Sequence, residues 1–91
     1  MILLTGATGF LGGFVLNELV AKGHEVTCFV RKTSIIDNIK NVNVKFIYGE
    51  LDDYKSICEA LKGKDTLINI ASLGFGHAPK IVGACEYAIV L

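Results

Sequence analysis

Apolar runs and amphipathic stretches alternate along this chain. Four runs rich in apolar, β-branched and aromatic residues are predicted to be strands: residues 1–5, 25–30, 42–48 and 66–71. Between the first two, residues 10–22 carry apolar side chains at helical spacing, and Gly23 follows where a left-handed helix end belongs. Strands that alternate with helices are typical of βαβ units. The pattern therefore predicts an α/β fold with a parallel sheet and flanking helices.

Two further helices are predicted from the same signals. One is capped at its start by Asp52 or Asp53 and ends at Gly63. The other begins at Pro79, whose fixed φ suits a first helical turn. The residues expected to face the sheet are Ile57, Ala60 and Leu61 in the former and Ile81, Val82, Cys85 and Ala88 in the latter.

The composition fits one small domain. The 91 residues are 52% hydrophobic and 20% charged, which suffices for one core and not for a cofactor domain plus a substrate domain. We therefore expect a single domain, residues 1–91. Nine basic residues balance nine acidic ones, so we expect neither nucleic acid nor a membrane surface as a partner. The first residues lack the basic and long apolar segments of a secretory signal, which predicts a cytoplasmic protein.

The cysteines favour no disulfide framework and no metal site. Cys28, Cys58 and Cys85 are odd in number, widely spaced and form no Cys-x-x-Cys pair. We interpret all three as reduced, packed thiols.

The strongest chemical signal is a glycine-rich turn between the first strand and the first helix, Thr5-Gly6-Ala7-Thr8-Gly9-Phe10-Leu11-Gly12-Gly13. Gly6 is expected to let the chain turn off the strand, Gly9 to let a pyrophosphate approach the backbone, and Gly12 to let helix and strand pack closely. The free N–H groups near Phe10 and Leu11 and the helix dipole would then attract the diphosphate. The predicted cofactor residues here are Gly6, Thr8, Gly9, Phe10, Leu11 and Gly12. The alternative is a tight turn with no ligand, because the spacing is Gly-x-x-Gly-x-x-Gly rather than the general Gly-x-Gly-x-x-Gly.

A second signal lies at the end of the second strand. Arg31 and Lys32 stand where an NAD site usually places a carboxylate for the adenosine ribose, and Ser34 follows them. A guanidinium binds a 2′-phosphate through two hydrogen bonds, whereas a carboxylate repels it. The sequence therefore predicts NADP, with NAD as the alternative, and predicts Arg31, Lys32 and Ser34 as cofactor residues. Two solvated basic residues ending a strand are the other interpretation.

These motifs resemble the N-terminal part of the extended short-chain dehydrogenase/reductase family, the epimerase, dehydratase and dihydroflavonol-reductase-like group. The glycine turn matches the cofactor turn of that family, Val30-Arg31-Lys32-Thr33-Ser34 resembles its NADP-preferring members, and Ala60-Leu61-Lys62-Gly63-Lys64-Asp65 resembles the approach to its fourth strand. The resemblance covers nearly the whole chain. It implies a Rossmann-type parallel sheet, here truncated after about four strands and therefore incomplete relative to the family.

The resemblance implies further cofactor residues. The Gly-Asp-Leu-x-Asp segment that meets adenine in the family stands here as Gly49-Glu50-Leu51-Asp52-Asp53, so Glu50 and Leu51 are implied on the adenine side. An acidic loop that only caps the next helix explains the same residues. Asn69-Ile70-Ala71-Ser72 is similar to the end of the family's fourth strand, which implies Ala71 and Ser72 beside the cofactor.

The catalytic residues that the resemblance implies are missing. The family uses a tyrosine activated by a lysine four residues later, and the residues four after Tyr48, Tyr54 and Tyr87 are Asp52, Cys58 and Leu91. A phenol transfers a proton poorly at neutral pH without such a cation. We therefore predict no catalytic residue and no activity for the chain alone.

Two functions remain open at this stage. One is the NADP-binding part of an oxidoreductase, epimerase or dehydratase, and the other is a non-enzymatic sensor of nicotinamide cofactors. The last residues stand where family members begin a fifth strand, and a sheet cut there leaves an unpaired edge and apolar surface. We therefore expect a homo-oligomer.

Overall fold

A computed structural model of the 91-residue chain describes residues 1–37, 39, 43–50, 53–70 and 87–90. Its centre is a five-stranded sheet with the order β3-β2-β1-β4-β5. The strands are β1 (Ile2–Thr5), β2 (Val26–Val30), β3 (Lys45–Tyr48), β4 (Thr66–Asn69) and β5 (Tyr87–Val90). All four neighbouring pairs are parallel, so the carboxyl ends of the strands share one edge. The predicted Rossmann-type sheet is confirmed, with one strand more than the four expected.

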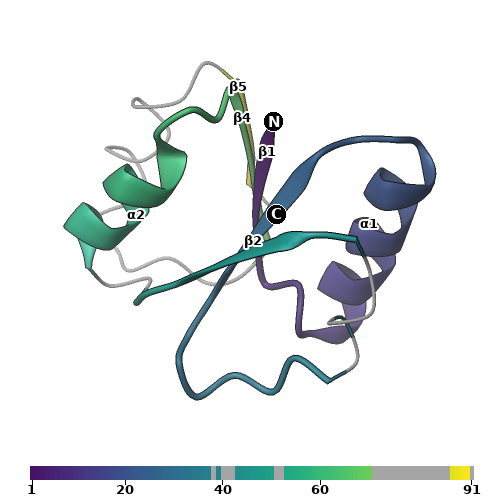
Figure 1. Cartoon of the computed structure of the whole chain (residues 1–91), viewed down its shortest axis with the longest axis horizontal. Coiled ribbons are helices and arrows are strands. Elements are labelled where there is room, and N and C mark those ends of the chain that lie inside the picture. The colour runs from purple at the N-terminus through teal and green to yellow at the C-terminus, as the bar shows by residue number, and fades with distance from the viewer. Residues whose placement is uncertain (38, 40–42, 51–52, 71–86, 91) are drawn as a thin grey trace.

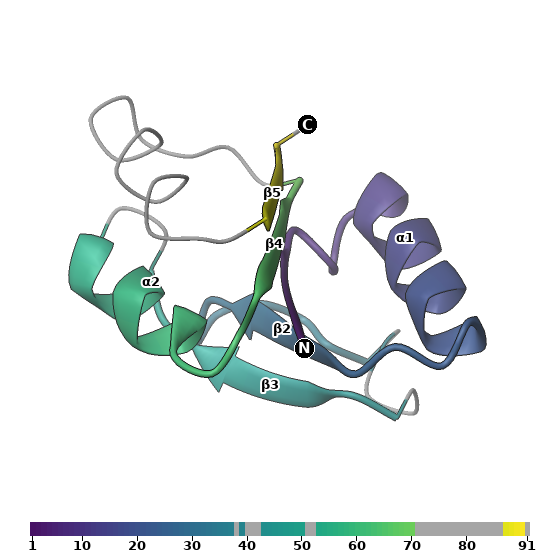
Figure 2. The same ribbon diagram turned by 90° about the horizontal axis from the view of Figure 1, so that it is seen from above.

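The helices cover opposite faces of this sheet. Helix α1 (Phe10–Ala21) lies on one side and α2 (Tyr54–Leu61) on the other (Figures 1 and 2). Asp53 is the N-cap of α2, because one of its carboxylate oxygens accepts a hydrogen bond of 3.1 Å from the backbone N–H of Lys55. Gly23 and Gly63 follow the two helices with φ of +83° and +76°, the left-handed conformation that the sequence predicts there.

Two apolar clusters hold these layers together, one on each face of the sheet. Successive residues of a strand point to opposite faces, so Ile2 and Leu4 enter one cluster and Leu3 the other. The buried residues of the α1 side are Ile2, Leu4, Ala7, Leu16, Val26, Cys28, Val30, Ile39 and Ile68. Those of the α2 side are Leu3, Phe29, Ile57, Ala60, Leu61 and Leu67. The three residues predicted to turn α2 towards the sheet are among them.

The predicted third helix is wrong at its last position. Ala88 was assigned to its inner face, but it lies in β5 and pairs with Leu67 of β4. The run Tyr87–Val90 is apolar and suits a strand buried between layers, so sheet pairing overrides the helical spacing of the preceding residues. The other residues of that helix, Pro79, Ile81, Val82 and Cys85, lie outside the described residues. β4 also ends at Asn69 rather than at residue 71.

Among the helices that the structure describes, none combines the length and the apolar character needed to cross a membrane.

Candidate cofactor site

The glycine-rich segment forms a tight turn at the carboxyl end of the central strand β1. Gly6 has a φ of +80°, a conformation that L side chains rarely adopt. The backbone N–H of Gly9 donates a hydrogen bond of 3.1 Å to the carbonyl of Gly6 and closes the turn. Helix α1 begins at Phe10, directly after it. The structure thus has the strand, turn and helix order that the sequence predicts.

Gly12 permits the close contact between α1 and this turn. A Cβ atom at Gly12 would lie 1.7 Å from the carbonyl oxygen of Gly6 and 2.9 Å from the Cα of Ala7. Both atoms belong to backbone, which cannot move aside as a flexible side chain can. Glycine at this position is therefore required by the fold itself, with or without a ligand.

Gly9 differs from both neighbours in the motif. Its φ is −83°, and a Cβ there would meet the carbonyl oxygen of Gly6 at 3.5 Å, an ordinary contact. Gly9 is exposed and is the N-cap of α1, and no side chain caps the helix. The first N–H groups of an α-helix have no partner within the helix. Nothing in the described fold requires glycine at this position.

The remaining predicted residues of the turn surround this helix end. Thr8 is exposed, and Phe10 and Leu11 expose 87% and 52% of their surface. The ring of Phe10 packs edge to face on Phe14, with 5.1 Å between the ring centroids. The side chains at the start of α1 thus face outward, while its backbone forms the floor of the site.

The basic residues follow β2, the immediate neighbour of β1. Thr5 lies opposite Phe29 in the register, so the end of β2 stands beside the glycine turn. Arg31 and Lys32 are exposed there, and the backbone N–H of half-buried Ser34 donates 2.9 Å to the carbonyl of Arg31. Two cations and an open helix N-terminus therefore share one edge of the sheet.

The end of β3 continues this edge. The backbone N–H of Gly49 donates 3.0 Å to the carbonyl of Val30, which ties the residue before Glu50 to the residue before Arg31. The side chain of Glu50 is exposed, and its carbonyl accepts 3.1 Å from the backbone N–H of Asp53. Leu51, the second residue predicted on the adenine side, lies outside the described residues.

A buried polar pair joins β1 to β4 at the same edge. The hydroxyl of Thr5 donates 2.5 Å to the side-chain carbonyl of Asn69, and it accepts 3.2 Å from the backbone N–H of Ile70. This contact fixes the glycine turn relative to the segment that follows β4. Ala71 and Ser72, the cofactor residues predicted in that segment, lie outside the described residues. The pair was not predicted from the sequence, although each residue is a polar position that ends an apolar run.

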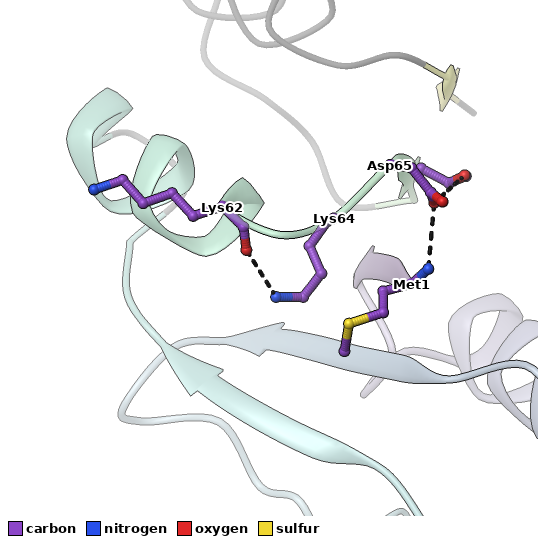
Figure 3. Close-up of polar contacts among 5 residues, drawn as sticks. Met1, Lys62, Lys64 and Asp65 are labelled. Atoms are coloured by element: carbon purple, nitrogen blue, oxygen red, sulfur yellow. Dashed lines mark hydrogen bonds and ion pairs between the residues drawn. The ribbon is translucent and has the colours of Figure 1, made fainter.

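Met1, Lys64 and Asp65 lie at the opposite edge of the sheet, where β1 and β4 begin, far from the glycine turn. The Met1 ammonium lies 3.3 Å from the Asp65 carboxylate, and Lys64 Nζ donates 3.3 Å to the carbonyl of Lys62 (Figure 3). The hydrogen bond from the hydroxyl of Thr66, and then the ammonium, lower the pKa of Asp65 below its ordinary value. These polar contacts join the start of β1 to the start of β4, and they take no part in the candidate site.

The cysteines are consistent with packed thiols where the structure describes them. Cys28 and Cys58 are free, and burial raises the pKa of Cys28 to about 11. Within the described part of the chain no group of three His, Cys, Asp or Glu side chains is arranged to hold a metal ion.

These contacts create a site suited to a dinucleotide. An uncapped helix N-terminus attracts a diphosphate, and that of α1 follows the carboxyl end of β1, which neighbours β4 at the point where the strand order reverses. The cations after β2 and the carboxylate after β3 extend the site along the edge, on the side where an adenosine would lie. The residues present therefore fit a nicotinamide dinucleotide.

Known proteins support the same assignment. A family model described as NAD(P)H-binding matches residues 6–90. Phenylcoumaran benzylic ether reductase 1 of Arabidopsis thaliana is 32% identical over 96 aligned residues, which cover 96% of this chain and 31% of that protein. Among solved structures, an isoflavone reductase superimposes with a TM-score of 0.76 at 27% identity, over 93% of this chain and 31% of the reductase.

A more distant structure shows the fold alone. A nucleoside-diphosphate-sugar epimerase from Pseudomonas aeruginosa has a TM-score of 0.70 at 24% identity, over 91% of this chain and 26% of the epimerase. The chain thus spans less than a third of the length of each of these proteins. The predicted resemblance to the reductase and epimerase group is confirmed, as is the predicted nicotinamide cofactor, NAD(P)H. The chain belongs to the NAD(P)H-binding family.

Proposed function

We propose that this chain binds NADP(H) in preference to NAD(H) at the carboxyl edge of the sheet. The observation that carries the proposal is the start of α1, where Gly9 leaves the helix N-terminus uncapped although the fold does not require glycine there. The backbone at Gly9, Phe10 and Leu11 binds the diphosphate. Gly6 and Gly12 hold the turn in shape, and Thr8 lies at its rim.

The preference for the phosphorylated cofactor rests on Arg31 and Lys32. Both are exposed directly after the strand next to the glycine turn, where the 2′-oxygen of the adenosine ribose would lie. The guanidinium of Arg31 binds the 2′-phosphate, and Lys32 and Ser34 add donors. A charge-assisted hydrogen bond of roughly 1.5 to 3 kcal/mol corresponds to a preference of about tenfold to a hundredfold.

The adenine side completes the proposed site. Glu50 accepts a hydrogen bond from the adenine amine, and Leu51 packs beside the ring. Ala71 and Ser72 let the cofactor lie close to the backbone after β4. Together with the glycine turn, these residues make residues 1–91 one cofactor-binding domain.

The activity we propose for the whole protein is that of a nicotinamide-dependent oxidoreductase, epimerase or dehydratase. The reductase that is 32% identical to this chain supports the oxidoreductase part of this class. Because no tyrosine of this sequence is followed by lysine four residues later, we propose that residues 1–91 bind cofactor without turnover. A sensor of cofactor state is the alternative, and it predicts binding without turnover in any longer form of the protein.

We also propose that the protein is cytoplasmic and forms homo-oligomers. The free thiols of Cys28 and Cys58 suit a reducing compartment. Exposed apolar side chains at the start of α1 suit self-association.

Calorimetric titration of the chain with NADPH and with NADH tests the cofactor proposal. We expect tighter binding of NADPH, and we expect Arg31→Ala to bring its affinity close to that of NADH. Lys62→Ala is the matched control, because it removes an exposed cation at the opposite edge of the sheet. Equal affinities for the two cofactors in the unmodified chain would refute the role of Arg31, and no binding of either would refute the proposed function.

A further inference from the structure

Gly49 occupies a narrow space between β2 and α2. A Cβ atom at this position would lie 2.7 Å from Cζ of Phe29 and 3.2 Å from Cβ of Ser56. Carbon atoms that attract each other without overlap are about 3.5 to 4.0 Å apart. Phe29 is 3% exposed and packs in the cluster on the α2 side, so its ring has no free space to enter. The backbone at Gly49 thus rests directly on the ring.

The backbone around Gly49 joins the two halves of the adenosine side. Its N–H donates 3.0 Å to the carbonyl of Val30, the residue that precedes Arg31. Glu50 follows Gly49 directly, and its carbonyl accepts 3.1 Å from the N–H of Asp53. Gly49, which lies against the ring of Phe29, therefore makes a hydrogen bond that links the ends of β2 and β3.

The end of α2 that faces this link is itself fixed. Asp53 accepts 3.1 Å from the backbone N–H of Lys55 and 3.0 Å from the hydroxyl of Ser56. The ring of Phe29 and the Cβ of Ser56 thus both lie within 3.2 Å of the point where a side chain at Gly49 would begin. Because Phe29 is buried, we expect a side chain at Gly49 to shift the backbone that carries Glu50.

We propose that Gly49 is a positioning residue for cofactor recognition, which sets the spacing between Glu50 on the adenine side and Arg31 on the 2′-phosphate side. The proposal rests on the proposed function, because both residues act there on one NADP(H) molecule. It predicts that two separate ligand preferences of the chain depend on Gly49, although Gly49 does not itself contact the cofactor. These are the preference for NADPH over NADH and the preference for adenine over hypoxanthine, which lacks the amine that Glu50 accepts from.

The test compares affinity ratios in Gly49→Ala and in the unmodified chain. NADPH, NADH and nicotinamide hypoxanthine dinucleotide are titrated into each protein by calorimetry. We expect both ratios to fall about fivefold or more, since each depends on a hydrogen bond worth a comparable factor. Gly63→Ala is the control for lost stability alone, because its φ of +76° also disfavours alanine but it lies at the opposite edge. We expect that control to keep both ratios.

A second pair of variants keeps the test decisive if Gly49→Ala does not fold. Phe29→Leu removes the tip of the ring, and Phe29→Leu with Gly49→Ala fills the space with the new methyl group. We expect the double variant to have ratios closer to those of the unmodified chain than Phe29→Leu has. Unchanged ratios in Gly49→Ala, equal losses in Gly63→Ala, or a double variant worse than Phe29→Leu would overturn the proposal. An unmodified chain that binds no cofactor would instead overturn the proposed function on which it rests.

Discussion

Three of the glycines after β1, Gly6, Gly9 and Gly12, are each present for a different physical reason. Gly6 is needed for its positive φ and Gly12 for the approach of α1 to the turn. Gly9 has an ordinary φ and room for a Cβ in the free chain. A ligand that approaches the helix N-terminus explains Gly9, whereas the fold explains the other two.

Replacement by alanine should therefore affect stability at Gly12 and cofactor binding at Gly9. Gly12→Ala should lower the free energy of unfolding by at least about 3 kcal/mol, because the new methyl group overlaps backbone atoms. Gly9→Ala should change it by less than about 1 kcal/mol and should weaken NADPH binding about tenfold or more. Urea unfolding and calorimetric titration measure the two quantities. A Gly9→Ala variant that binds NADPH normally would show that the turn exists for packing alone.

The hydroxyl of Thr5 gives a second prediction at the same scale. Thr5→Val keeps the shape of the side chain and removes its hydrogen bonds to Asn69 and Ile70 in a buried position. Loss of buried hydrogen bonds should lower the free energy of unfolding by about 1 to 3 kcal/mol. Thr66→Val is the matched control, because the hydroxyl of Thr66 donates its hydrogen bond to the exposed side chain of Asp65. Equal costs for both variants in urea unfolding would contradict the importance of the buried pair.

Spacing along the chain predicts some of these residue roles and is silent on others. The roles of Gly6 and Gly12 follow from a local motif, because the atoms they approach lie in the same turn. The contact of Gly49 with Phe29 depends on the pairing of β2 with β3, and Thr5 meets Asn69 across 64 positions of sequence. No local pattern contains such contacts. They follow only once the order and the register of the strands are known.

Local pattern and sheet pairing also compete at the level of whole elements. The first four strands and two helices were predictable, because the strands are apolar runs and α1 and α2 are each followed by a glycine with positive φ. Ala88 was assigned to a helix because it continues the spacing of Val82 and Cys85. In the structure it pairs with Leu67 of β4, and such a partner far away in sequence is invisible to a periodicity argument.

The contact between the starts of β1 and β4 predicts an acid-dependent stability. The pKa of Asp65 is lowered by the hydroxyl of Thr66 and by the Met1 ammonium, so the folded state favours the charged carboxylate. The stabilisation by this carboxylate is fully present above the pKa that Asp65 has in the unfolded chain. It is lost as the pH falls through the lower pKa that Asp65 has in the folded chain. Asp65→Asn should therefore flatten the acid side of the profile of unfolding free energy against pH. Parallel profiles for both proteins between neutral and acid pH would show that the ion pair contributes nothing.

Over the whole molecule, apolar side chains gather on the outer side of α1. Phe10, Leu11 and Phe14 expose 87%, 52% and 59% of their surface, and a groove beside them is lined by Phe14, Val15, Glu18, Leu19 and Lys22. This helix carries the cofactor turn at its start, so self-association and cofactor binding would involve the same element. The sequence predicts exposed apolar surface in general terms, but only the packing of α1 on the sheet identifies which side chains stay outside.

Sedimentation velocity over increasing concentration tests this consequence of the whole fold. We expect the sedimentation coefficient to rise with concentration. Burial of large apolar side chains between copies lowers the free energy by about 25 cal/mol for each Å² of apolar surface removed from water. Phe14→Ser should shift the rise to higher concentration, since it removes the aromatic side chain that joins Phe10 to the groove. Ile35→Ser is the matched control, because Ile35 is 75% exposed but lies in the segment after β2 rather than in α1. A coefficient that stays at the monomer value, or an equal effect of both variants, would exclude the outer side of α1 as the surface of association.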